Sequence, residues 1–215
     1  MTIETMISTL SKEGAKKKFP PPASILRRWI GLFFCYAFGM MLFFPIRPDF
    51  FIKINDPYFL IQITAIFLMM MSAAVSASYL ALPDGNQKSW VRFIPFFPLI
   101  LVFIILIHTL LTWGSAAFIG CLEGSQFACA RAAFLFSVLP SAVIFYTIQK
   151  AAPLRYYWAG TMAGLVGSSM GYLLLLLVEP HENPAHLLIW HFFPVLVTIG
   201  IAMALGKKIL GRWQR

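Results

Sequence analysis

Two stretches of the sequence, residues 93–113 and 157–178, contain no Asp, Glu, Lys or Arg. A water-soluble fold has no place for apolar runs of this length. A transmembrane helix, which rises about 1.5 Å per residue, needs about 20 such residues to cross about 30 Å of hydrocarbon. The rest of the chain agrees, because 60% of its 215 residues are hydrophobic and only 12% are charged. We therefore predict an integral membrane protein, and soluble enzymes are excluded.

Six apolar runs of similar length follow one another, separated by short polar segments. None of them alternates like a strand, and lipid leaves only helices or closed barrels to satisfy the backbone. The predicted fold is therefore all-α, a polytopic membrane bundle of six transmembrane helices. We expect a tail with a short amphipathic helix over residues 1–28, a transmembrane domain over 29–206 and a basic tail over 207–215. The six spans are predicted at residues 29–46, 58–82, 93–113, 127–148, 157–178 and 187–205.

Basic residues are distributed unevenly between the two sides of such a bundle. An even number of spans places both termini on one side, and 14 of the 17 Lys and Arg residues fall on that side. Only Arg47, Lys53 and Arg131 fall on the opposite side. Because loops rich in Lys and Arg stay in the cytoplasm, both termini are predicted to be cytoplasmic. Topology then explains the net charge of +9, and no direct contact with nucleic acid is expected.

Small and aromatic residues have predicted places in this bundle. The fifth span carries four glycines spaced by four, three and four residues, which form one helix face that a neighbouring backbone can approach closely. Cys35, inside the first span, is expected to be a small core residue. The tryptophans lie at or just beyond the span ends, as in an aromatic belt. The glycines are Gly160, Gly164, Gly167 and Gly171, and the tryptophans are Trp29, Trp90, Trp113, Trp158, Trp190 and Trp213.

The N-terminal tail contains apolar residues at helical spacing, which predicts a short amphipathic helix. This helix either lies on the lipid surface or binds the groove of a cytoplasmic protein, and the pattern favours neither. Three consecutive lysines would help the contact with lipid. The apolar residues are Ile3, Met6, Ile7 and Leu10, and the lysines are Lys16, Lys17 and Lys18.

Thiols, imidazoles and carboxylates gather on the predicted outward side, and together they are the ligand set of a transition-metal site. Two cysteines there, Cys121 and Cys129, could instead form a disulfide or a redox pair, or all these groups could be ordinary loop residues. His181, His186 and His191 are each five residues apart, a spacing that does not align them on one α-helix face. The candidate metal ligands are Cys121, Cys129, His181 and His186, beside Glu123, Glu179, Glu182 and His191.

No catalytic motif is present. The sequence has no Gly-rich phosphate loop, no nucleophile elbow, no helical pair of histidines with an intervening glutamate and no cysteines two residues apart. We predict that the protein is not an enzyme and needs no cofactor, although a metal ion could act as a signal. No Asp or Glu falls inside a span, which disfavours a coupled transporter. A small metal or solute carrier and a membrane thiol oxidoreductase remain the alternatives.

Several short motifs, in order, resemble one known family. The tail ends in prolines and arginines, an outward loop follows the first span, and Glu179-Pro180-His181-Glu182 precedes the last. From about residue 5 to residue 213 the chain resembles the NrsF family, six-span anti-sigma factors of the bacterial inner membrane. These hold a sigma factor of the extracytoplasmic-function group inactive. The other motifs are Arg47-Pro48-Asp49, Asp56-Pro57-Tyr58-Phe59, Leu82-Pro83-Asp84-Gly85 and Ala152-Pro153-Leu154.

The resemblance implies a multi-pass inner-membrane protein whose cytoplasmic part sequesters the sigma factor. That part would be the tail residues Ile3, Met6, Ile7, Leu10, Lys16, Lys17 and Lys18, assisted by Lys88, Arg92, Lys150 and Arg155.

The resemblance also implies that the outward part senses an envelope, oxidative or metal stress signal and triggers release. Cys129, Cys121, Glu179 and His181 are the sensing candidates. Family members resemble one another in carrying a cysteine at the start of the fourth span and another in the last outward loop. Cys129 matches the first, but Glu179 stands at the second position, so that pair cannot form here. Cys121 is left as a substitute partner for Cys129. The departure disfavours redox sensing and favours recognition of a metal or another signal by Cys129, Cys121 and the nearby histidines.

Overall fold

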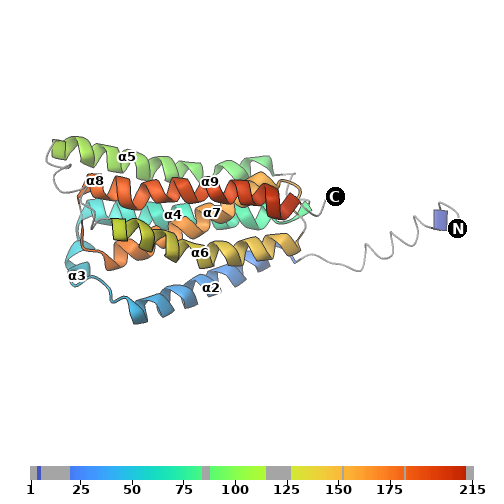
Figure 1. Ribbon diagram of the computed structural model, residues 1–215, viewed down its shortest axis with the longest axis horizontal. Helices are drawn as coiled ribbons and strands as arrows, with labels where there is room; N and C mark the ends of the chain where they lie inside the picture. The colour runs from blue at the N-terminus through green and yellow to red at the C-terminus, as the bar shows by residue number, and fades with distance from the viewer. Residues whose placement is uncertain are drawn as a thin grey trace.

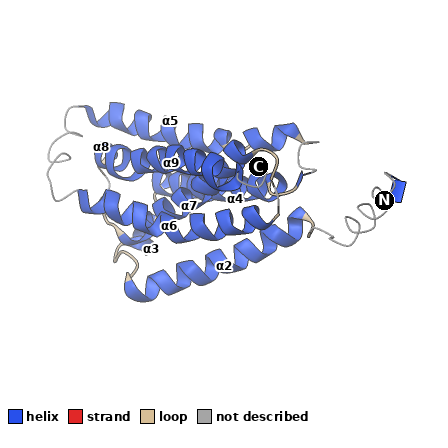
Figure 2. Ribbon diagram, turned by 45° about the vertical axis from the view of Figure 1, so that its right-hand side comes forward, coloured by secondary structure: helices blue, strands red, loops and turns tan. Residues whose placement is uncertain are grey.

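The computed structural model describes residues 4–5, 20–83, 88–114, 127–151, 153–181 and 183–211. Within these ranges the chain is helical with no strand, and six helices are long and apolar enough to cross a membrane (Figures 1 and 2). The predicted all-α bundle of six spans is confirmed. The elements are α2 Pro22–Phe43, α3 Phe50–Lys53, α4 Pro57–Leu80, the 3-10 helix Ser89–Phe93, α5 Phe96–Trp113, α6 Phe127–Lys150, α7 Tyr156–Val178, α8 Pro184–His186, the π-helix Leu187–Phe192 and α9 Phe193–Leu210.

The first and last helices extend beyond their apolar runs. α2 begins at Pro22, seven residues before the predicted span, because proline is favoured in the first helical turn. α9 continues to Leu210 through Lys207 and Lys208, which are good helix formers and favourable in a last turn. The predicted domain borders at 28/29 and 206/207 therefore fall inside helices. Hydropathy marks where a helix meets lipid, whereas local propensity and capping decide where it ends.

Helix α7 forms the centre of the bundle. It packs against α4, α6 and α9, and most of its residues are buried. α5 covers α4 on one side, and α2 lies along α4 at the opposite edge (Figure 1). The outer faces of α2 and α5 carry large exposed apolar side chains, including Phe34, Phe38 and Leu111. Such faces suit lipid and not water.

The four glycines of α7 face two different neighbours. A β-carbon on Gly160 would lie 2.5 Å from the Ala202 carbonyl oxygen of α9, and Gly164 faces the same helix. A β-carbon on Gly171 would lie 2.5 Å from the Ala133 carbonyl oxygen of α6, which Gly167 also faces. α7 therefore has two close contacts, one in each half of the helix.

Two residues of α2 lie where the sequence analysis did not expect them. Cys35 is exposed and not part of the core, and Trp29 is only 1% exposed and not part of an interfacial belt. The buried residues of α2 are Ile25, Trp29 and Phe33, spaced by four, so they form the stripe that contacts the bundle. Cys35 follows Phe33 by two residues and therefore points to the opposite face.

The two ends of the bundle differ in composition. α2 begins and α9 ends at one end, here called the proximal end (Figure 1). The end of α6 and the start of α7 lie there too, with Lys150 and Arg155. The opposite, distal end contains α3, α8, the start of α6 and the end of α7. An even number of spans requires this arrangement, while the compartment that each end faces remains a prediction.

Candidate functional site

The distal end brings together a thiol, three imidazoles and a carboxylate from separate segments. Cys129 lies in the first turn of α6, Glu179 directly follows α7, and His181 lies in the connection to the last span. His186 ends α8, and His191 belongs to the π-helix that follows it. We call these five residues the distal cluster.

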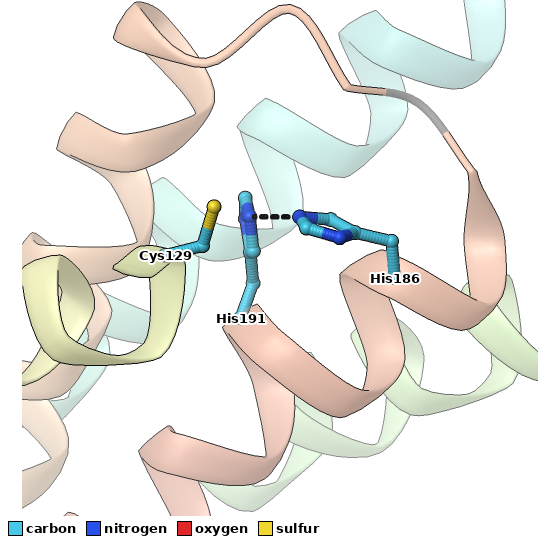
Figure 3. A group of neighbouring side chains, drawn as sticks. All are labelled: Cys129, His186 and His191. Atoms are coloured by element: carbon cyan, nitrogen blue, oxygen red, sulfur yellow. Dashed lines mark hydrogen bonds between the residues drawn. The ribbon is translucent and has the colours of Figure 1, made fainter. Parts of the chain in front are cut away.

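His186 and His191 lie on one face of the last span. Their Nε2 atoms are 3.2 Å apart, and both side chains are buried (Figure 3). Asn183 starts this span, since its Oδ1 accepts hydrogen bonds from the backbone N–H groups of Ala185 and His186 at 2.9 and 3.3 Å. The expectation that histidines five residues apart do not share a face is wrong for this pair. Residues 187–192 form a π-helix, whose hydrogen bonds join residues five apart instead of four.

Cys129 completes a compact trio with these two histidines. One ligand atom from each of Cys129, His186 and His191 lies within 4.8 Å of the other two, and all three residues are buried. In Figure 3 the His191 ring stands between the thiol of Cys129 and the ring of His186. Cys129 is a free thiol, and Cys121 lies outside the described residues.

Glu179 connects this trio to the distal surface. Its Oε2 is 4.0 Å from the Cys129 sulfur, and its Oε1 makes a close contact with Nδ1 of His181. The His181 ring stacks on His186 with ring centroids 5.1 Å apart, and about half of the His181 side chain is exposed. Glu179 stands at the position where the family resemblance implies a second cysteine. It therefore lies directly beside Cys129 and offers a carboxylate in place of a thiol.

Arg47 holds the segment that carries Glu179. Its buried guanidinium donates to both carboxylate oxygens of Asp49 at 2.6 and 2.7 Å, and to the carbonyls of Glu179 and Pro180, each at 3.3 Å. Its backbone N–H donates to the Leu177 carbonyl at the end of α7. The guanidinium lowers the pKa of Asp49, so the pair stays charged at neutral pH. The Arg47-Pro48-Asp49 motif at the distal end therefore fixes the end of α7 and the position of Glu179.

A cavity of about 270 Å³ opens beside the distal cluster. Arg47 and His181 line it near the surface, and Gln62 lines it between the helices. Gln62 Nε2 donates a 2.9 Å hydrogen bond to the Tyr172 hydroxyl, and the Tyr172 ring meets the His191 ring edge-to-face at 5.7 Å. Gln62 and Tyr172 therefore connect the wall of the cavity to the buried His191.

The structure brings together only some of the predicted site residues. Cys129, Glu179, His181 and His186 meet in the distal cluster, while Cys121 and the tail residues Ile3, Met6, Ile7, Leu10, Lys16, Lys17 and Lys18 lie outside the described ranges. Among the predicted outward groups, His191 was not a candidate ligand, although its Nε2 lies 3.2 Å from Nε2 of His186. A π-helical register, which places residues five apart together, is the signal that would have found it.

Comparison with known proteins identifies one family. The family model described as NrsF, negative regulator of sigma F, matches residues 12–213, nearly the whole chain. No curated protein and no solved structure matches the chain.

Proposed function

The chain belongs to the NrsF family of negative regulators of sigma F, and from this premise we propose that it is a membrane-bound anti-sigma factor. It sequesters an extracytoplasmic-function sigma factor at the bacterial inner membrane and releases it on an envelope, oxidative or metal stress signal. Such a regulator acts by binding and not by catalysis. The observation that carries the proposal is the family match, which includes all six apolar helices.

The proximal end offers a basic surface for this partner. Four of its cations lie over aromatic rings, which holds them in place while leaving their charge available. Lys150 Nζ is 4.1 Å from the centroid of the Tyr146 ring, and the Arg92 guanidinium is 4.7 Å from that of Phe93. Lys88 and Lys207 lie over Tyr79 and Tyr157 in the same way.

We assign the main contact to the N-terminal tail, through Ile3, Met6, Ile7 and Leu10 and the lysines at 16, 17 and 18. An amphipathic helix that leads into a basic surface suits a partner with an apolar groove and an acidic rim.

Signalling between the two ends requires two states of the bundle that differ in affinity for the sigma factor. Helices α6, α7 and α9 connect the distal cluster to the proximal end, and their packing depends on the α7 glycines. A shift of about 1–3 kcal/mol between the states would change the affinity by about 5- to 150-fold. We assign this shift to a rearrangement of the α7 contacts.

Affinity capture tests the proposal. The tagged full-length protein is purified from native membranes in mild detergent, beside a variant that lacks residues 1–18, and bound proteins are identified by mass spectrometry. A third sample, with Lys16, Lys17 and Lys18 replaced by Ser, keeps the apolar face and separates its contribution from that of charge. We expect a sigma factor with the full-length protein, less of it with the serine variant, and none with the truncation.

Two outcomes would contradict parts of the proposal. If folded full-length protein captures no sigma factor, the anti-sigma function is wrong. If the truncated protein captures as much sigma factor as the full-length protein, the function stands but the assignment of the contact to the tail is wrong.

A further inference from the structure

We propose that Cys129, His186 and His191, completed by Glu179, form a binding site for one divalent metal ion of the zinc class. The proposal rests on the distal cluster alone and does not depend on the sigma factor. It differs from the ligand set predicted from the sequence, because it includes His191 and Glu179 and places His181 outside the ligands.

The spacing of the imidazoles fits a tetrahedral ion. With zinc–nitrogen bonds of about 2.0–2.1 Å, two ligand nitrogens of a tetrahedral site lie about 3.3 Å apart. The two Nε2 atoms are 3.2 Å apart, so an ion can bridge them with little movement of either ring. The ligand atom of Cys129 lies within 4.8 Å of a ligand atom of each histidine, and a zinc–sulfur bond of about 2.3 Å requires it to approach by at most about 1 Å.

The two buried rings face each other through Nε2. Between two neutral imidazoles this contact holds one proton, so one Nε2 donates and the other accepts. An ion between the rings uses both Nε2 lone pairs and replaces the contact of two like groups by two coordinate bonds.

The charge of the ligand set suits its buried position. A thiolate, a carboxylate and two neutral imidazoles around a divalent ion give a neutral centre, which is the least costly state inside a bundle of low polarity. Glu179 Oε2 supplies the fourth ligand atom in this proposal, since it lies 4.0 Å from the Cys129 sulfur. His181, which contacts the other oxygen of Glu179, would then orient the carboxylate in the way that second partners orient metal ligands.

The donor atoms select the class of metal. Thiolate and imidazole favour Zn²⁺, Co²⁺ and Cd²⁺ over Mg²⁺ and Ca²⁺, which prefer oxygen ligands only. The site meets the distal surface at Glu179 and His181, since His181 is half exposed and lines the cavity beside the cluster.

Cobalt spectroscopy tests the site directly. The full-length protein is prepared with Cys35 and Cys121 replaced by Ser, so that Cys129 is its one thiol, and is titrated with Co²⁺ in detergent under reducing conditions. We expect one Co²⁺ per chain, with the intense visible bands of tetrahedral cobalt and a thiolate-to-cobalt charge-transfer band. Zn²⁺ should remove both, and Mg²⁺ should not.

Variants of this single-cysteine protein identify the ligands. Cys129→Ser should abolish the charge-transfer band, and His191→Gln should weaken Co²⁺ binding by at least about tenfold, the minimum expected for a direct ligand. Glu179→Gln, at the accessible edge of the cluster, should keep the band and weaken binding. His108→Gln is the matched control, since His108 is an exposed histidine that stacks on Tyr58, and it should bind like the parent.

A second measurement serves if a buried variant fails to fold. In the single-cysteine protein with all its histidines in place, Zn²⁺ should slow alkylation of Cys129 by at least about tenfold, because a coordinated thiolate is not free to react. The proposal is overturned if the folded single-cysteine protein binds Co²⁺ without a charge-transfer band, if His191→Gln binds as tightly as the parent, or if Zn²⁺ leaves alkylation unchanged. Sigma-factor capture enters none of these readouts, so the two proposals fail independently.

Discussion

Gln62 and Tyr172 form a buried hydrogen bond between α4 and α7. The Tyr172 hydroxyl is fully buried, and burying it without a partner would be costly. Gln62 also lines the distal cavity, and Tyr172 touches His191. The pair therefore fixes the depth of α4 against α7 and supports the distal cluster from inside.

We expect Tyr172→Phe to destabilise the protein by about 1–3 kcal/mol, because it leaves the Gln62 amide without an acceptor. Gln62→Leu should cost a similar amount. The double variant should cost less than the sum of the two, with a coupling of about 0.5–2 kcal/mol, the range found for hydrogen bonds between membrane helices. Unfolding in mixed detergent micelles measures all three variants, and strictly additive effects would mean that the hydrogen bond contributes nothing.

At the scale of the element, α7 holds the bundle together through backbone contacts. Its glycines allow carbonyl groups of α6 and α9 to approach where a side chain would stand. Gly206 on α9 faces Gly160 in the same way, since a β-carbon on Gly206 would lie 2.5 Å from the Tyr156 carbonyl oxygen. Both helices therefore contribute small residues to this contact, as expected where lipid provides no hydrophobic drive for association.

Alanine substitutions separate these glycines from those that face open space. Gly160→Ala and Gly171→Ala should each destabilise the bundle by about 1–3 kcal/mol, because the added methyl group overlaps backbone of α9 or α6. Gly39→Ala and Gly200→Ala should be neutral or stabilising by up to about 1 kcal/mol, because nothing lies within 4 Å and alanine favours the helix. Thermal unfolding in detergent checks the signs, and equal effects at all four positions would disprove the packing argument.

At the scale of the whole molecule, the two ends carry different chemistry. The proximal end is basic and aromatic, and the distal end combines thiol, imidazole and carboxylate groups. Each end of α7 thus lies near one of the two proposed sites. If the proximal end binds the sigma factor, as we propose, it must face the cytoplasm, where a sigma factor is found.

Reporter fusions test that orientation. Alkaline phosphatase, which is active only outside the cytoplasm, should be active when fused after Gly114 at the distal end. It should be inactive when fused after Lys150 or Gly211 at the proximal end. A fluorescent protein that folds only in the cytoplasm should give the reverse pattern at the same three positions. The opposite result with both reporters would place the distal cluster in the cytoplasm and remove the proposed sensing geometry.

The sequence by itself determined the number, order and approximate position of the six long helices. Whether a segment enters lipid depends on its own length, hydropathy and charge, and those properties belong to one segment at a time. The same reasoning places the start of α2 and the end of α9 at one end of the bundle. The glycine spacing in α7 likewise indicated close helix contacts before any neighbour was known.

Only the tertiary structure decided which side chains meet. Cys35 faces outward because α2 contacts the bundle through Ile25, Trp29 and Phe33, and hydropathy alone does not indicate the contacting side of a helix that is apolar all round. His191 reaches His186 because residues 187–192 adopt a π-helix, whereas the sequence pattern was evaluated with the period of an α-helix. Residues from α6, α7 and the last span form the distal cluster, so its composition depends on how three separate helices pack.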